Sequence, residues 1–385
     1  MAENKEKKVL NVPNLRFPEF EGEWVVSRLS EYLNENKERN KKGLFNKTDV
    51  LSVSGDFGIV NQIDLLGRSF AGASVLPYHV VRLGNIVYTK SPLKEYPYGI
   101  VKTNTGKVGI VSTLYAVYSV NDNANNKFIE YYFSLANRAN RYFKPIVRIG
   151  AKHDMKIGNQ EVLTNQVVFP TVKEQEKIAD FLSLLDERIS TQNKIIEDLK
   201  KLKSAISDRL FKNIKGDVIT LSEICDIVKG KQINGEYLTE SGEYYVMNGG
   251  TEPSGYYGDY NVDANTISIS EGGNSCGYVQ FNTSPFWSGG HCYSIQNIAD
   301  NIDNLYLYHY LKSKEDAIMK LRIGSGLPNI QKKDLAMFKI EIPTIKQQKK
   351  ISTFLSSLER KAEIEERIQN AMLKEKQFLL RQMFI

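Results

Sequence analysis

VFPTVKEQEKI, residues 168–178, returns as EIPTIKQQKKI at residues 341–351. The same spacing between the two copies then holds without a gap as far as Phe211 and Phe384. Each copy closes one half of the chain, and each begins a stretch almost free of Gly and Pro. The repeat therefore predicts two equivalent modules, each followed by an equivalent helix, and such a protein is suited to recognising a target that is itself in two parts.

Length and composition place the chain among folded intracellular proteins. Its 385 residues exceed one ordinary core, and 41% of them are hydrophobic, so we expect two or more domains. No apolar run reaches the ~18 residues of a membrane span, and the N-terminus lacks an apolar signal region. Three cysteines without metal-like spacing indicate a reducing compartment. We expect a cytoplasmic protein with no membrane contact.

Charge is unevenly distributed along the chain. The net charge is +6, yet residues 216–342 carry 9 basic and 16 acidic side chains, and residues 232–311 contain no Lys or Arg. A simple basic nucleic-acid binder would not show this pattern. Charge alone therefore favours DNA binding only weakly.

Four segments follow from these patterns. They are a first globular domain, a central helix, a second globular domain and a C-terminal helix, at residues 1–170 (with a tail of about 1–17), 171–215, 216–342 and 343–385. Both globular domains contain β-type runs, such as the alternating Thr266–Ser270 and the longer Gly109–Tyr118. Short helices are expected at 128–135 and 305–311. The fold class is α+β, with one scaffold used twice and with different sequences in the middle of each copy.

Apolar residues in the two helical segments recur at steps of three and four, which predicts a heptad seam. Polar residues interrupt the seam at Gln192 and Lys203, and both interruptions recur in the second copy. This favours two helices paired in a fixed register. The simpler alternative is that each helix packs only on its own globular domain. The predicted seam consists of Ile178, Leu182, Leu185, Ile189, Ile196, Leu199, Ile206, Leu210, Ile351, Leu355, Leu358, Met372, Leu379 and Met383.

Motifs of catalysis are missing from the sequence. There is no phosphate-binding loop, no Gly-rich cofactor loop and no motif of an amino-methyltransferase. The four histidines are far apart and lack the spacing of metal ligands. His291 and Cys292 lie in an apolar run, and we expect both to face the core. The sequence predicts no catalytic residue, no metal and no cofactor bound by this chain.

Loops with glycines, amides and hydroxyls are instead suited to reading base edges, because glycine permits close approach and small polar groups can hydrogen-bond. Simple turns are the competing interpretation of each loop. An arginine beside a glycine at equivalent positions of both modules is suited to holding phosphate. The candidate DNA-binding residues are Lys90, Ser91, Lys102, Asn104, Lys107, Arg141, Arg148, Lys229, Lys231, Asn248, Thr251, Asn274, Ser275, Arg322, Ser325 and Asn329.

Three features together resemble the specificity subunits of type I restriction–modification systems. They are the segment Leu15–Trp24, the Pro-x-x-x-x-Gln-x-x-Ile starts at Pro170 and Pro343, and the loop Asn248–Tyr257. The resemblance covers essentially the whole chain in order. It implies two target-recognition domains that each read half of a bipartite double-stranded DNA site, on two long antiparallel helices that set the gap.

The resemblance also implies partners. Two methyltransferase subunits would dock on the helices and carry S-adenosylmethionine, and two restriction (motor–nuclease) subunits would use ATP and Mg²⁺. The acidic second domain departs from the expected pattern, since a DNA-facing surface is usually basic.

Two other functions stay open from the residues alone. One is a self-contained restriction enzyme with its own recognition domains, although the four segments leave no room for a catalytic domain. The other is a coiled-coil scaffold whose domains bind protein or carbohydrate, which the lack of Lys and Arg in residues 232–311 permits.

Overall fold

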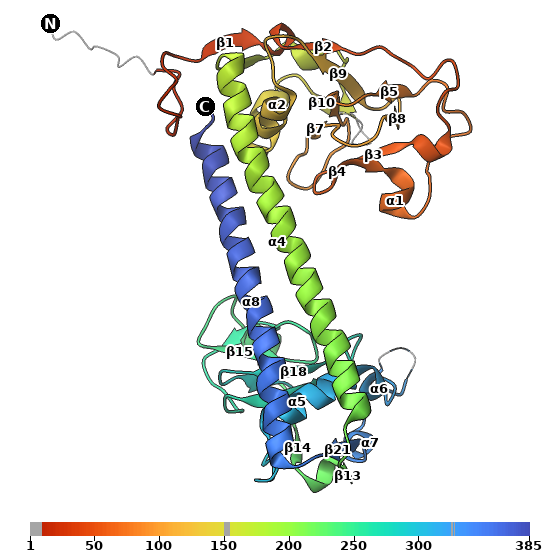
Figure 1. The fold of residues 1–385 in the computed structure, drawn as a ribbon, viewed down its shortest axis with the longest axis vertical. Helices are drawn as coiled ribbons and strands as arrows, with labels where there is room; N and C mark the ends of the chain where they lie inside the picture. The colour runs from red at the N-terminus through yellow and green to blue at the C-terminus, as the bar shows by residue number, and fades with distance from the viewer. Residues whose placement is uncertain (1–9, 150–154, 325, 327) are drawn as a thin grey trace, which may run out of the picture. The chain divides into compact units, whose positions relative to one another are not determined.

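The computed structural model describes residues 10–149, 155–324, 326 and 328–385. Its contacts divide the chain into two compact units. Unit 1 comprises residues 1–191 and 369–385, and unit 2 comprises residues 192–368. Each unit contains one globular part together with a portion of α4 (Val172–Asn213) and a portion of α8 (Ile345–Gln382), the two long helices of Figure 1.

Unit 1 is built on a four-stranded antiparallel sheet with the strand order β2-β9-β6-β7. Smaller pairs, β1-β12, β3-β4, β5-β8 and β10-β11, surround it. The strands are β1 (Val25–Arg28), β2 (Leu33–Glu35), β3 (Leu51–Ser54), β4 (Gly58–Asn61), β5 (His79–Val81), β6 (Ile86–Tyr88), β7 (Val101–Thr103), β8 (Gly109–Val111), β9 (Ala116–Val120), β10 (Arg148–Ile149), β11 (Met155–Lys156) and β12 (Gln166–Phe169). The short helices are α1 (Gln62–Leu66), α2 (Asn126–Phe133) and α3 (Ala136–Phe143).

Unit 2 has a four-stranded sheet with the order β14-β20-β17-β18, a β13-β21 pair, and a three-stranded sheet β16-β15-β19. The strands are β13 (Asp217–Thr220), β14 (Asp226–Lys229), β15 (Tyr244–Met247), β16 (Tyr256–Tyr257), β17 (Thr266–Ser270), β18 (Val279–Asn282), β19 (Trp287–Ser288), β20 (Cys292–Gln296) and β21 (Lys339–Ile342). The short helices are α5 (Asn304–Ser313), α6 (Glu315–Met319) and α7 (Lys332–Ala336).

The two main sheets have the same strand order. In each unit the first sheet strand, β2 or β14, follows a short 3₁₀ turn with the sequence Leu-Ser-Glu, at Leu29–Glu31 and Leu221–Glu223. In each unit the strand before the long helix, β12 or β21, pairs with the first strand of that unit. The predicted internal repeat is therefore a repeat of topology, and the α+β fold class is confirmed.

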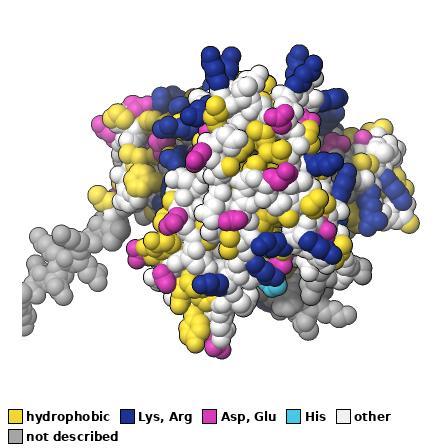
Figure 2. Space-filling model, turned by 90° about the horizontal axis from the view of Figure 1, so that it is seen from below, with side chains coloured by type: hydrophobic (Ala, Val, Ile, Leu, Met, Phe, Trp, Pro, Cys, Tyr) yellow, Lys and Arg dark blue, Asp and Glu magenta, His cyan; other side chains and the backbone are white. Residues whose placement is uncertain are grey.

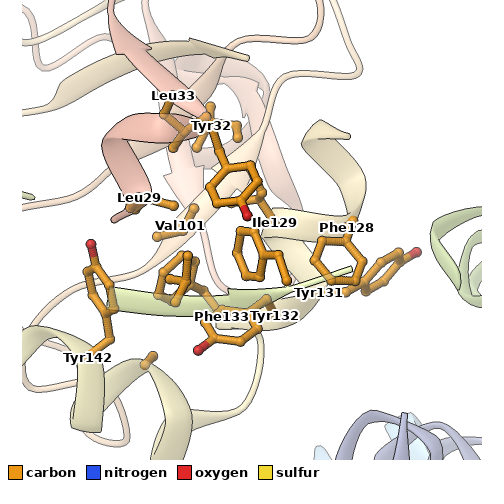
Figure 3. Packing of buried hydrophobic residues seen from close by; sticks show 14 of the residues in the cluster. Leu29, Tyr32, Leu33, Val101, Phe128, Ile129, Tyr131, Tyr132, Phe133 and Tyr142 are labelled. Carbon is orange, nitrogen blue, oxygen red and sulfur yellow. The ribbon is translucent and has the colours of Figure 1, made fainter. Parts of the chain in front are cut away.

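Aromatic side chains fill the core of unit 1. Figure 3 shows Tyr32, Phe128, Tyr132 and Phe133 packed among aliphatic neighbours. The C-terminal end of α8 completes this core with Leu380, and Phe384 just beyond the helix is buried with its ring centroid 5.0 Å from that of Phe128. In unit 2, Phe211 at the end of α4 contacts Tyr306 and Tyr310 of α5. Each globular part is thus packed on helix residues from both long helices.

Several expected elements are present. The strand Thr266–Ser270 and the helices expected at 128–135 and 305–311 correspond to β17, α2 and α5. The β-type run at Gly109–Tyr118 is divided between two strands. A turn at residues 112–115, closed by the Tyr115 amide donating to the Ser112 carbonyl at 3.0 Å, separates β8 from β9. None of the described helices is both long enough and apolar enough to cross a membrane.

Candidate nucleic-acid interface

The seam residues of α4 and α8 pack against other side chains of the same unit. Ile178 and Leu182 join the core of unit 1 with Leu379 and Met383, and Ile206 and Leu210 pack in unit 2 beside Ile351 and Leu355. The fourteen predicted positions are all buried or half-buried, whereas Leu184 and Phe378, off the seam, are 61% and 57% exposed. Within unit 2 the partners of Gln192 and Lys203 are Glu365 and Glu359, so the helices run antiparallel.

The polar interruptions of the seam pair across the two helices. In unit 2, Lys203 Nζ donates to Glu359 Oε1 at 2.6 Å, and the Tyr308 hydroxyl donates to the same oxygen at 3.0 Å. In unit 1, Lys376 pairs with Asp186, which also accepts from the Tyr131 hydroxyl at 2.8 Å. Lys376 is the repeat counterpart of Lys203, and Glu359 is that of Asp186. The same tyrosine–carboxylate–lysine group therefore occurs once in each unit.

Gln192 joins its own repeat counterpart. Its side-chain amide donates to the Glu365 carboxylate at 2.6 Å and to the Glu365 carbonyl at 3.1 Å, and Glu365 is the residue that takes its place in the second copy. Gln192 is 7% exposed. A buried polar contact at a seam position fixes register, because any slip leaves a polar group unpaired.

The repeated glutamine of the Pro-x-x-x-x-Gln motif is a structural clamp. Gln175 Nε2 donates to the Pro170 carbonyl at 3.0 Å and to the Asn123 carbonyl at 3.1 Å, and its Oε1 accepts from the Asn125 amide. Gln348 repeats this arrangement in unit 2 with Pro343, Asn301 and Asp303. Each glutamine fixes the start of a long helix to the loop that caps α2 or α5.

Four loops of unit 2 converge at one end of its main sheet. The His291 amide donates to Asn248 Oδ1 at 3.1 Å, and the Glu271 amide donates to the His291 carbonyl at 2.9 Å. The Gly273 amide donates to the Pro328 carbonyl, and Gly272 forms an isolated bridge with Asn329. The structure therefore brings together candidates that are far apart in the sequence.

Glycines allow this convergence of backbone. Gly230 follows β14, and a Cβ atom there would lie 2.2 Å from the carbonyl oxygen of Gly289. A Cβ atom on Gly289 would lie 2.6 Å from Asn248 Oδ1. Side chains at these positions would push the loops apart.

The candidate residues of unit 2 differ in exposure. Lys231, Thr251, Asn274, Arg322 and Asn329 are exposed, whereas Asn248 and Ser275 are half-buried. Lys229 is held by an ion pair with Glu271, the two charged atoms being 2.6 Å apart. Ser325 lies outside the described residues.

The candidate residues of unit 1 also differ in exposure and in contacts. Lys107, Arg141, Arg148 and Ser91 are exposed. Lys102 lies 3.7 Å from the carboxylate of Glu130. Lys90 Nζ donates to Asn159 Oδ1 at 2.6 Å, and burial is the main cause that lowers the pKa of Lys90.

Asn104 is not presented to a ligand. It is 1% exposed, its side-chain amide donates to the carbonyls of Lys107 and Arg82, and its Oδ1 accepts from the Gly106 amide. The prediction that Asn104 reads DNA is therefore wrong, because its polar atoms shape the turn after β7. This is the usual alternative for an asparagine two residues before a glycine in a turn.

Two residues near the unit 2 loops differ from the sequence-based expectation. The apolar run predicts that His291 faces the core, but its side chain is 63% exposed, while Cys292 is buried as predicted. Glu271 is not among the candidates, yet its buried carboxylate accepts from Lys229 and from the Tyr293 hydroxyl. In the sequence, Glu271 is marked only by its place directly after an alternating strand and before two glycines.

Basic side chains do not form one broad patch on the face that Figure 2 shows. In the face that Figure 2 shows, Lys and Arg are scattered among acidic, polar and hydrophobic side chains. Among the described residues no group of three His, Cys, Asp or Glu side chains is arranged to hold a metal ion. This face offers scattered cations rather than a continuous basic surface.

Comparison with known proteins identifies the class of this architecture. The model of the family described as "Type I restriction modification DNA specificity domain" matches residues 81–201 and 213–374, well over half of the chain. The chain therefore belongs to the family of type I restriction–modification DNA specificity subunits, as the sequence motifs predicted. This membership favours a specificity subunit over a scaffold for carbohydrate or an enzyme with its own catalytic domain.

Relatives carry the same description. A putative type I specificity subunit of Mycoplasma genitalium is 32% identical over 158 residues, which is 40% of this chain and 41% of that protein. One of Mycoplasma pneumoniae is 33% identical over 146 residues, 37% of this chain and 39% of that protein. The chain thus spans about two fifths of the length of these curated relatives.

A solved structure shares the fold. The crystal structure of a type I restriction–modification S subunit from M. genitalium superposes with a TM-score of 0.67 at 18% identity, covering 97% of this chain and 99% of that one. A structure from a study of complex assembly in a type I system has a TM-score of 0.55 at 16% identity and covers 94% of this chain and 96% of that one. Both confirm the predicted α+β fold with long helices.

Proposed function

We propose that this chain is the DNA-reading subunit of a type I restriction–modification complex, in which unit 1 reads one half of a bipartite site and unit 2 reads the other. The observation that carries this proposal is the repeated topology, with the same sheet order and the same anchors to the long helices in both units. The loops at the sheet ends differ in sequence and in charge, so each unit is suited to a different half-site.

The long helices have the further role of fixing the gap between half-sites and of binding partners. Their outward faces carry large apolar side chains, among them Leu184, Leu202, Phe354 and Phe378. Exposed apolar side chains of this size on long helices are suited to partner binding. We assign these faces to two methyltransferase subunits, which would carry S-adenosylmethionine and methylate adenine. Two motor–nuclease subunits, which would use ATP and Mg²⁺, complete the restriction complex.

DNA affinity is shared with those partners. Unit 2 is acidic overall, so its phosphate contacts come from a few exposed cations such as Lys231 and Arg322 and from the methyltransferase subunits. The chain itself supplies no catalytic group. It acts in the cytoplasm, where its DNA target and its partners are.

A genome-wide map of N6-methyladenine tests this function. We expect cells that express the chain with a cognate methyltransferase subunit to methylate a single bipartite motif, and we expect that motif to be absent when the chain is omitted. Salt-dependent retention of DNA by the purified complex is the accompanying binding measurement. A stable complex that methylates nothing, and that binds all DNA sequences equally, would contradict the proposal.

A further inference from the structure

The ammonium group of Lys229 is fixed at the end of the main sheet of unit 2. Lys229 is the last residue of β14, and its Nζ donates to Glu271 Oε1 at 2.6 Å. The same oxygen accepts from the Tyr293 hydroxyl at 3.1 Å, and that hydroxyl also lies 3.0 Å from the Ile330 carbonyl. The Glu271 side chain is 9% exposed, whereas that of Lys229 is 52% exposed. A buried carboxylate thus holds a lysine whose other side faces solvent.

The Glu271 carboxylate can accept further hydrogen bonds. Its Oε2 atom is buried and has no hydrogen-bond partner, and Nδ1 of the exposed His291 lies 3.8 Å from it. A buried carboxylate oxygen without a donor is costly, so the site attracts donors strongly. This favours rotamers that keep the Lys229 ammonium beside Glu271 at the end of the sheet.

The surroundings of Lys229 fit a base edge better than a phosphate chain. The glycine-rich loops at 248–250, 272–273 and 289–290 converge here and bring amides and carbonyls close to the site. Residues 232–311, which supply most of these loops, contain no Lys or Arg. An ammonium that is paired with a carboxylate and surrounded by hydrogen-bonding loops supplies direction more than it supplies general attraction for DNA.

Unit 1 also has an anchored lysine at the equivalent end of its main sheet, but different residues hold it. Ile86 of β6 pairs with Tyr118 of β9, and Ile267 of β17 pairs with Ile295 of β20 in the same way. Lys90 follows Ile86 by four residues, and Glu271 follows Ile267 by four residues. Lys90 Nζ donates to Asn159 Oδ1 at 2.6 Å, and Asn159 Nδ2 donates to Glu35 at 2.8 Å. Both sheets therefore end in an ammonium group anchored by buried or half-buried polar side chains, although the lysine comes from a different strand in each.

We infer that Lys229 is a specificity-determining residue that reads a guanine in the half-site of unit 2, and that Glu271 is the positioning residue that aims it. This rests on the proposed function. An ammonium has three donors. One is used by Glu271, which leaves two for the O6 and N7 acceptors that guanine presents in the major groove. A lysine on phosphate would need no buried carboxylate to aim it.

A panel of DNA duplexes tests this with the intact complex of the chain and its methyltransferase subunits. Each base pair of both half-sites is replaced in turn, and binding is measured for wild type, Lys229→Met, Glu271→Gln and Lys231→Met at several salt concentrations. For Lys229→Met we expect discrimination at one G·C pair of the unit 2 half-site to fall by about tenfold or more. Discrimination in the other half-site stays unchanged.

Two further variants distinguish the positioning of Lys229 by Glu271 from the general effect of a positive charge. Glu271→Gln keeps the shape and weakens the hold on Lys229, so it should reduce discrimination at the same base pair by less than Lys229→Met does. Lys231→Met is the matched control, an exposed lysine two residues away with no ion-pair partner among the described residues. It should weaken binding to all sequences alike and lower the salt slope by about one.

Three outcomes decide the inference. Loss at one G·C pair in Lys229→Met supports it even where Glu271→Gln unfolds. Uniform weakening with a salt slope lower by about one makes Lys229 a phosphate contact and overturns it. An unchanged binding profile of Lys229→Met also overturns it. A wild-type complex without any sequence preference would instead contradict the proposed function, so the two failures are distinguishable.

Discussion

At the scale of single residues, the side chains most visible in the sequence have structural roles. Gln175 and Gln348 stand out as parts of a repeated motif, and each fixes a helix start to a neighbouring loop. Asn104 is of a type suited to reading bases but closes its own turn. The reader that we infer, Lys229, depends on Glu271, 42 residues away. A local pattern cannot reveal such a pair, because strand pairing creates it.

His309 makes the stability of unit 2 depend on pH. It is 2% exposed, its Nε2 lies 2.9 Å from Ser356 Oγ, and burial lowers its pKa to about 4. The imidazole is therefore neutral in the folded chain, and the unfolded chain binds the proton more readily. The stabilisation is present above pH ~6.5 and is lost as the pH falls from there toward 4.

Urea unfolding of the full chain and of His309→Gln measures this effect. Between pH 7.5 and pH 5 we expect wild type to lose roughly 2 kcal/mol more of its free energy of unfolding than the variant, which cannot titrate. The glutamine keeps a group that can hydrogen-bond Ser356. Equal losses in the two proteins would show that the buried histidine does not control this pH dependence.

At the scale of elements, the long helices were more predictable than most of the strands. The heptad pattern predicts two long helices at 171–215 and 343–385, and α4 and α8 occupy residues 172–213 and 345–382. A period of 3.6 sustained over a whole long helix is a local signal. The strands have only two to five residues, and the strength of each depends on a distant partner, so the β-type run at Gly109–Tyr118 does not reveal the turn that divides it into β8 and β9.

The helices also give a prediction about spacing. Four residues inserted after Gln192, with four more after Ile364 to keep the seam in register, add about 6 Å of helix. We expect the methylated motif to keep both half-sites and to gain roughly two base pairs of gap. Methylation mapping measures the gap directly.

The control inserts the four residues only after Gln192. This shifts the seam against α8 and separates pairs such as Lys203 and Glu359, so the complex should lose stability. If the double insertion leaves the gap unchanged while both half-sites are still methylated, the helices do not set the spacing.

At the scale of the whole molecule, the repeat is the feature that the sequence revealed most fully. The fixed spacing between the two copies predicts two modules and two helices, and the strand orders β2-β9-β6-β7 and β14-β20-β17-β18 carry the same repeat into the sheets. The tyrosine–carboxylate–lysine groups at Asp186 and Glu359 extend it to side chains. What each module reads depends on loops that the repeat does not constrain.

Modularity is the central claim, and exchange of one recognition domain tests it most directly. Residues 18–170 are replaced by the equivalent domain of a relative with a different known half-site, and N6-methyladenine is mapped in cells that supply the methyltransferase subunit. We predict that one half-site changes to that of the donor, while the other half-site and the gap stay as in wild type. A change in both half-sites, or no change in either, would contradict the account of two independent readers on one helical frame.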